Sequence, residues 1–217
     1  MSEEKVLENT SHFVKNILEG EGTGHDWWHI ERVTNLAKSI AEKEGANLFI
    51  CQMAALLHDI ADEKLNESEE AGLELVREWL NKQQIDETIK NQILEIVRTI
   101  SFKGGHGPNL TTLEAKVVQD ADRLDAIGAI GIARCFIYAG AKGHLMYDPH
   151  LSPRESMTKE EYRHGESTAI NHFYEKLLKL KDLMNTDEGY RLAEERHRFM
   201  EDYLRQFFSE WDGSMFK

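Results

Sequence analysis

Residues 54–62 read AALLHDIAD, an apolar run that ends in the adjacent pair His58 and Asp59. A buried helix that carries an imidazole beside a carboxylate needs a charge partner at that point. An unpaired buried carboxylate is strongly destabilising or gives up its charge. A divalent metal is one such partner, since it accepts imidazole nitrogen and carboxylate oxygen together. A mutually satisfied pair in the protein core is the structural alternative.

Two other segments carry residues of the same chemical types. Upstream, His25 and His29 are four residues apart in HDWWH, so a helix would place them on one face. Downstream, QDADRLD contains Asp120, Asp122 and Asp125, of which the last two are three apart and can face one cleft. Either segment is also compatible with surface histidines or a solvated acidic face. Together they offer the groups that would complete a coordination sphere.

The composition is that of a globular helical protein. The 217 residues are enough for one substantial core, with 41% hydrophobic and 30% charged residues. Only three prolines occur, and the alternation typical of strands is scarce, so we expect an all-α, single-domain bundle. The net charge of -13 argues against binding of a nucleic-acid polymer. A phosphorylated small molecule is still compatible, because a bound cation reverses the local field.

The cysteines and the N-terminal residues bear on the cellular compartment. Cys51 and Cys135 both lie in apolar helical contexts, which favours buried free thiols over a disulfide. The first residues, MSEEKVLENT, are acidic and polar and lack the features of a signal or transit peptide. No apolar run approaches the roughly 20 residues that a membrane helix needs. We therefore expect a cytoplasmic protein with no membrane partner.

Hydrophobic periodicity and capping residues predict a series of helices. They lie at about 3–19, 25–44, 47–59, 66–80, 86–100, 111–124, 126–138, 158–184 and 187–211. Thr111 with Glu114 and Thr158 with Glu161 have the spacing of capping boxes. The third helix is apolar on most sides, so we expect it to be central. The longest irregular stretch, about 140–157, has a length typical of mobile or functional loops.

At this point the sequence resembles a known family. His29 in HIERV, His58 and Asp59 in LLHDIAD, and Asp122 in DADRLDAIGAIG follow the pattern of the HD-domain metal-dependent phosphohydrolase superfamily. The segments GHDWWHIERV, SFKGG and TAINHFYEKLLKLKDLMNT extend the resemblance over nearly the whole chain. They resemble small bacterial HD hydrolases that include nucleoside triphosphate pyrophosphohydrolases.

The resemblance implies a domain layout and a metal site. It implies one HD-type domain over residues 1–217, with a metal-binding core at about 20–130. Helices at about 158–211 would cover the cleft. His29, His58, Asp59 and Asp122 would bind one divalent ion, and such nitrogen and oxygen ligands suit Mn²⁺, Mg²⁺, Co²⁺, Ni²⁺ or Fe²⁺.

The resemblance also suggests roles for neighbouring polar residues, each of which has a supporting or surface role as its alternative. A metal-activated water would attack a phosphorus atom, and positioned cations would offset the phosphate charge. The candidate phosphate contacts are Arg32, Lys64 and Lys103. Asn171 and His172 are candidates to bind the nucleotide base or sugar, with a polar role in the core or a subunit contact as their alternatives. Candidate general bases are Asp62 and Asp125, and candidate proton donors are His25 and His106.

The predicted reaction is hydrolysis of a ribo- or deoxyribonucleoside triphosphate to its monophosphate and pyrophosphate. Hydrolysis of a nucleotide phosphomonoester or cyclic phosphodiester is the alternative within the enzyme class. A non-catalytic nucleotide sensor and a helical bundle without metal are the alternatives outside it. The expected partners are a nucleotide, or another phosphorylated small molecule, and a second copy of the chain in a homodimer.

Overall fold

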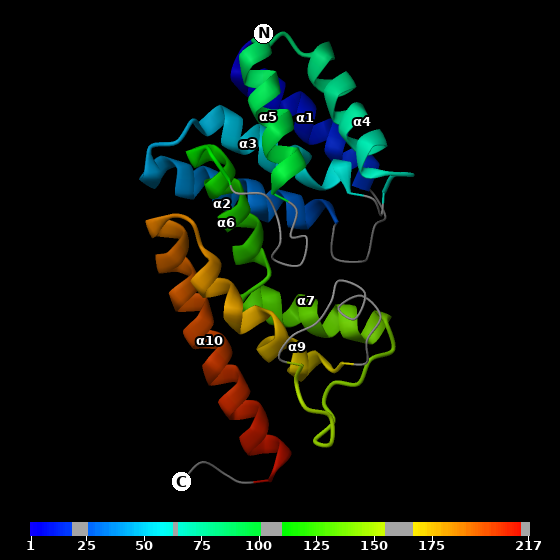
Figure 1. Ribbon diagram of the computed structural model, residues 1–217, viewed down its shortest axis with the longest axis vertical. Helices are drawn as coiled ribbons and strands as arrows, with labels where there is room; N and C mark the ends of the chain where they lie inside the picture. Colours follow the sequence, from blue (N-terminus) through cyan, green and yellow to red (C-terminus); the bar gives the residue numbers. More distant parts are fainter. Residues whose placement is uncertain (19–25, 63–64, 101–109, 155–166, 214–217) are drawn as a thin grey trace. The chain divides into compact units, whose positions relative to one another are not determined.

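The structure is a computed structural model that describes residues 1–18, 26–62, 65–100, 110–154 and 167–213. Within these ranges every regular element is a helix, which confirms the predicted all-α fold (Figure 1). The elements are α1 (Glu3–Leu18), α2 (Trp27–Glu44), α3 (Leu48–Leu57), the 3-10 helix η1 (His58–Ala61), α4 (Glu69–Lys82), α5 (Glu87–Thr99), α6 (Leu113–Asp125), α7 (Gly128–Ala141), α9 (Ala169–Glu175), the 3-10 helix η2 (Leu177–Leu183) and α10 (Asp187–Trp211).

The chain forms two compact units, Met1–Asp122 and Arg123–Lys217. The expected single functional domain over 1–217 therefore stays a prediction. Among the described residues no single helix has the length and apolar character needed to cross a membrane, although α6 and α7 taken together, across the bend between them, meet that test of length and composition.

The first unit is built around α3, which packs against α1, α2 and α5 (Figure 1). Eight of its ten residues are buried, because their side chains are apolar on nearly every face of the helix. The Asn47 side chain caps the helix by accepting a hydrogen bond from the Ile50 backbone N–H, and the Glu114 carboxylate accepts one from the Asn47 N–H. The predicted central position of α3 is thus confirmed within this unit.

At His58 the apolar helix tightens into η1, which α4 and α5 cover. Gly72 of α4 lies so close to η1 that a Cβ there would be 2.7 Å from Ala61 Cα. The Asn66 side-chain amide donates hydrogen bonds to the carbonyls of Ile60 and Asp62, at 2.7 and 2.9 Å. The short turn that carries His58 and Asp59 is therefore held by backbone contact on one side and by an amide clamp at its end.

In the second unit, α10 packs against α7 and η2, and α9 packs against the same two elements. The rings of Phe136, Phe173 and Tyr203 join α7, α9 and α10. Arg154 forms an ion pair with the buried carboxylate of Glu175, at 2.8 Å. This pair fastens the irregular segment after α7 to α9.

Within the described residues, the expected single helix from 158 to 184 is α-helical only from Ala169 to Glu175. Helix α9 ends at Glu175, because Lys176 has φ -136° and ψ -59°, and the chain continues as η2. Leu177 and Leu180 are buried and three residues apart, a spacing that the three-residue turn of a 3-10 helix places on one face. The predicted capping box at Thr158 and Glu161 lies outside the described residues.

The start of α6 also differs from its prediction by one residue. The side-chain hydroxyl that accepts from the Ala115 N–H belongs to Thr112, not Thr111. Since Glu114 is used to hold the start of α3, the threonine and the glutamate do not form the expected reciprocal box.

Candidate metal centre

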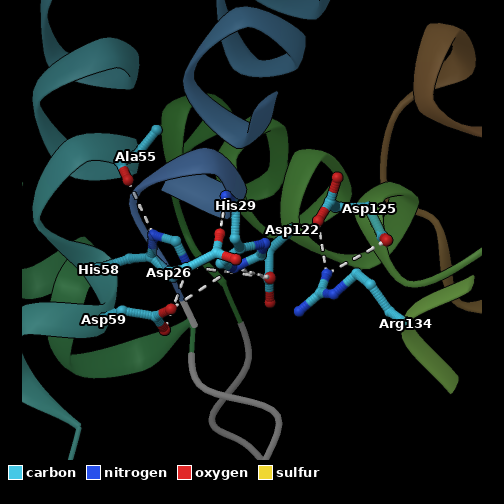
Figure 2. Close-up of polar contacts among 8 residues, drawn as sticks. All are labelled: Asp26, His29, Ala55, His58, Asp59, Asp122, Asp125 and Arg134. Carbon is cyan, nitrogen blue, oxygen red and sulfur yellow. Dashed lines mark hydrogen bonds and ion pairs between the residues drawn. The ribbon is translucent and has the colours of Figure 1, made fainter. Parts of the chain in front are cut away.

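The first histidine of the site lies in the first turn of α2. Asp26 is the N-cap of this helix, and its Oδ1 accepts a hydrogen bond from the His29 backbone N–H at 2.9 Å. The His29 side chain is only 1% exposed and is directed at the carboxylates of Asp59 and Asp122 (Figure 2). The periodicity of α2 places Ile30 and Val33 in the same buried face.

The second histidine is oriented by the backbone of α3. His58 Nδ1 lies 2.8 Å from the Ala55 carbonyl oxygen. A carbonyl oxygen only accepts, so Nδ1 carries the hydrogen and Nε2 presents its lone pair in the neutral ring. Bonding of one ring nitrogen to a carbonyl, with the other left for a cation, is the usual arrangement of metal-ligating histidines.

Two carboxylates meet the two imidazoles (Figure 2). His29 Nε2 lies 3.5 Å from Asp59 Oδ2 and 3.5 Å from Asp122 Oδ1. His58 Nε2 lies 3.3 Å from Asp59 Oδ1 and 3.8 Å from Asp122 Oδ1. Both Nε2 atoms are inaccessible to solvent. Groups from α2, η1 and the last turn of α6 thus converge within the first unit.

Three of these four spacings fit a shared cation, and the fourth, between His58 Nε2 and Asp122 Oδ1, is at 3.8 Å about 0.3 Å longer than the range expected for adjacent ligands. Ligand atoms bonded to one metal at about 2.0–2.2 Å, with angles near 90–110°, lie about 3.0–3.5 Å apart. Good hydrogen bonds between nitrogen and oxygen are shorter, about 2.7–3.2 Å. Donor atoms of His29, His58 and Asp59 all lie within 4.8 Å of one another, so this group could hold a metal ion. The donor set is nitrogen and oxygen without sulfur, which excludes a thiolate zinc site.

Three further predicted site residues are in the described part of the chain near these elements. Asp125 ends α6, and its buried carboxylate pairs with Arg134 of α7 at 2.5 Å. Asp62 ends η1, where its carbonyl accepts from the Asn66 amide. Arg32 lies on α2 and is half-buried. The ion pair of Asp125 favours a role in fixing structure over proton transfer, because the Arg134 guanidinium already engages its carboxylate.

The two predicted base-binding residues lie on α9 in the second unit. Asn171 is buried, and its amide donates to the Leu151 carbonyl at 2.9 Å. Burial, assisted by the positive charges of Lys176 and Arg154, lowers the pKa of His172 to about 4, while Glu175 acts in the opposite direction. Asn171 therefore holds the segment before it, and His172 is a neutral ring at neutral pH. The other four predicted residues lie outside the described part of the chain: His25, Lys64, Lys103 and His106.

Two residues with evident structural roles were absent from the prediction. Asp26 caps the helix of His29, and Arg134 binds Asp125. A signal for Asp26 was present, because aspartate directly before a helical pattern is a preferred N-cap. The pairing of Arg134 with Asp125 crosses from one helix to another, so no helical spacing indicates it.

Comparisons with known proteins agree with this geometry. The HD domain model matches residues 27–127, which contain all four converging side chains. YpgQ of Bacillus subtilis is 42% identical over 215 residues, which cover 98% of this chain and 97% of YpgQ. The chain belongs to the HD-domain family.

Solved structures extend the similarity to the fold. The crystal structure of an HD-superfamily hydrolase from Bacillus thuringiensis has a TM-score of 0.80 and 50% identity, and it covers 97% of this chain and 99% of that one. The structure of B. subtilis YpgQ in complex with ADP has a TM-score of 0.76 and 41% identity, with 97% of each chain covered. The resemblance to HD hydrolases is therefore confirmed, and the chain is an HD-superfamily hydrolase.

Proposed function

We propose that this hydrolase uses one divalent metal to cleave nucleoside triphosphates to the monophosphate and pyrophosphate. His29, His58, Asp59 and Asp122 would hold the ion. The observation that carries the proposal is the convergence of two imidazole nitrogens and two carboxylates at 3.3 to 3.8 Å. The ADP bound to YpgQ supports a nucleotide as substrate, because the two chains are 41% identical over nearly their whole lengths.

The donor set narrows the choice of metal. Two imidazoles and two carboxylates suit Mn²⁺, Mg²⁺, Fe²⁺, Co²⁺ or Ni²⁺ and leave room for further ligands. Such an ion, when bound, lowers the pKa of coordinated water and polarises a phosphoryl oxygen. The chain itself supplies the orientation: the Ala55 carbonyl fixes the His58 ring, and the side chains of Asp59 and Asp122 bring negative charge to the imidazole nitrogens.

The remaining roles extend the proposal. With a net charge of -13 on the chain, a polyphosphate needs local cations to approach. We assign that role to Arg32, Lys64 and Lys103, and contact with the base or sugar to His172. Asn171 ranks behind His172 for this contact, because its buried amide is bound to the Leu151 carbonyl. Proton transfer falls to Asp62, His25 or His106. Asp125, as the partner of Arg134, ranks last among these candidates for proton transfer.

Product analysis tests the reaction. The purified chain is incubated with ribo- and deoxyribonucleoside triphosphates and with Mn²⁺, Mg²⁺, Co²⁺ or Ni²⁺ in turn. We expect monophosphate and pyrophosphate in equal amounts, with free phosphate appearing only after inorganic pyrophosphatase is added. Direct release of phosphate together with the diphosphate would indicate cleavage at the γ-phosphate instead, and release of phosphate from a nucleoside monophosphate would indicate a phosphomonoesterase. Stabilisation by nucleotide without any product would indicate a sensor.

Substitutions test the residues. Asp122→Asn and His58→Ala should each reduce hydrolysis by at least about 100-fold, because removal of a ligand weakens metal binding and the activation of water. Asp202→Asn is the matched control, since Asp202 is an exposed residue of α10 that pairs with its helix neighbour Arg205. Full activity of Asp122→Asn would contradict the proposed ligand set.

A further inference from the structure

We propose that Asp26 is a positioning residue of the metal centre, which acts by capping α2 and thereby fixing the backbone of His29. The proposal rests on the proposed function in one respect, namely that His29 is a metal ligand. Asp26 itself is not assigned a contact with metal or substrate.

Three hydrogen bonds join Asp26 to the first turn of α2. Its Oδ1 accepts from the His29 N–H at 2.9 Å, and its carbonyl oxygen accepts from the N–H groups of His29 and Ile30 at 3.1 and 3.4 Å. The backbone of Asp26 is extended, with φ -79° and ψ 170°, as N-caps require. His29 is the third residue of the helix, so its N–H is one of the donors that a helix leaves without a partner four residues back.

The position of this cap matters because a metal ligand follows it directly. Helix ends fray, and fraying is confined to the first and last turns. Metal–ligand distances tolerate only about 0.2 Å of error. His58, by contrast, follows a ten-residue helix of which eight residues are buried, and its ring is held by the Ala55 carbonyl. Among the described residues, Asp26 therefore secures the end of the helix on which His29 depends.

The chain contains a matched control for this cap. Asp86 is the N-cap of α5, and its Oδ1 accepts from the Thr88 N–H at 2.7 Å. The residue type is the same as at Asp26, and each carboxylate accepts from a first-turn N–H, that of the third helical residue at Asp26 and of the second at Asp86. The first turn of α5, however, carries no proposed ligand, so loss of the Asp86 cap should affect stability alone.

Titration calorimetry of Mn²⁺ into the metal-stripped full chain tests the proposal. Thermal unfolding in EDTA runs in parallel for the same variants. We expect Asp26→Ala to raise the Kd for Mn²⁺ by about tenfold or more, the effect typical of partners behind a ligand. Asp26→Asn and Asp26→Ser keep an acceptor oxygen and should stay within about threefold of the wild type. Asp86→Ala should lower the unfolding temperature and leave the Kd unchanged.

Three outcomes would overturn the proposal. A wild-type Kd for Asp26→Ala would show that the cap does not hold the ligand. A Kd for Asp26→Asn as weak as that for Asp26→Ala would assign the effect to charge rather than to capping. An equal loss of Mn²⁺ affinity in Asp86→Ala would show that the effect of Asp26→Ala is general destabilisation. Should Asp26→Ala fail to fold, Asp26→Gly removes the same carboxylate and is expected to fold, because glycine is a tolerated N-cap residue.

The metal site itself is checked separately. If His29→Ala binds Mn²⁺ as tightly as the wild type, the proposed function loses a ligand and the cap has nothing to position. If His29→Ala binds weakly while Asp26→Ala binds normally, the metal site stands and only the role of Asp26 is lost.

Discussion

His172 shows how one buried side chain couples stability to pH. Burial lowers its pKa to about 4 in the folded chain, against about 6.5 in an unfolded one. Between these values the unfolded chain takes up a proton and the folded chain does not, so stability falls as pH falls from 6.5 to 4. The loss is at most about 3 kcal/mol. Urea unfolding of wild type and His172→Gln from pH 7 to pH 4.5 should show a steeper fall in the wild type; parallel curves would contradict it.

The cysteines allow a chemical test at the same scale. Burial, with the Glu114 carboxylate nearby acting in the same direction, raises the pKa of Cys51 to about 12, and burial raises that of Cys135 to about 12. Both thiols are free, and Cys51 is fully buried as predicted, whereas Cys135 is half-buried. Reaction with a disulfide reagent at pH 8 needs an accessible thiolate. We expect no reaction in the native chain and two equivalents in denaturant; one rapid native equivalent would contradict it.

At the level of residues, the sequence predicted the proposed metal ligands better than the groups that orient them or bind their neighbours. His29, His58, Asp59 and Asp122 were selected by residue type and by family resemblance, and the structure brings their donor atoms together. The Ala55 carbonyl could not have been selected, because every residue has one and only the fold directs it. The partner of Asp125 was also hidden, since Arg134 reaches it from another helix.

At the level of elements, the contact between α4 and η1 predicts a substitution with two effects. Gly72→Ala would place a Cβ against the Ala61 backbone, so either α4 or η1 must shift. We expect a loss of about 1–3 kcal/mol in the free energy of unfolding. Because η1 carries His58 and Asp59, affinity for Mn²⁺ should also fall.

Gly140→Ala provides the control for this prediction. Gly140 lies on an exposed position of α7 with nothing within 4 Å of an added Cβ. Alanine there should stabilise the helix by about 0.5–1 kcal/mol. Chemical denaturation and Mn²⁺ calorimetry of both variants compare the two sites. If Gly72→Ala lowers stability but leaves metal affinity intact, η1 does not transmit the shift.

A second prediction at this level concerns the ion pair of Arg154 and Glu175, which joins the segment after α7 to helix α9. Burial tends to raise the pKa of Glu175, but hydrogen bonds from Arg154 and Ser167 outweigh this and hold the pKa below its usual value. Arg154→Met should therefore cost about 3 kcal/mol, because it leaves a buried carboxylate poorly compensated. The double substitution Arg154→Met with Glu175→Leu should recover part of that loss. Denaturant unfolding of all four combinations measures the coupling; additive losses would contradict it.

The helices themselves were largely readable from periodicity and caps. The predicted range 187–211 coincides with α10, and the predicted starts at about 47 and 86 fall on Asn47 and Asp86, the N-caps observed for α3 and α5. The failure at Lys176 has a physical cause: Leu177 and Leu180 fit one face of either an α-helix or a 3-10 helix. Packing within the second unit selects the 3-10 helix, and the spacing of apolar residues along the chain does not reveal that packing.

At the level of the whole molecule, metal binding should stabilise the first unit more than the second. All four proposed ligands lie within Met1–Asp122, the first compact unit. A ligand at 100 times its Kd adds about 2.7 kcal/mol to the stability of the state that binds it. Hydrogen exchange with and without Mn²⁺ should therefore show slower exchange in α2, α3 and η1, with little change in α9 and α10. Equal protection of α10 would contradict this expectation.

The buried rod of α3 runs into the ligand-bearing turn with no linker between them. Any laboratory selection for heat resistance that repacks Met53 or Leu56 will also move the imidazole and carboxylate that follow. Variants selected only for thermal stability should therefore also differ in their relative affinities for divalent metals.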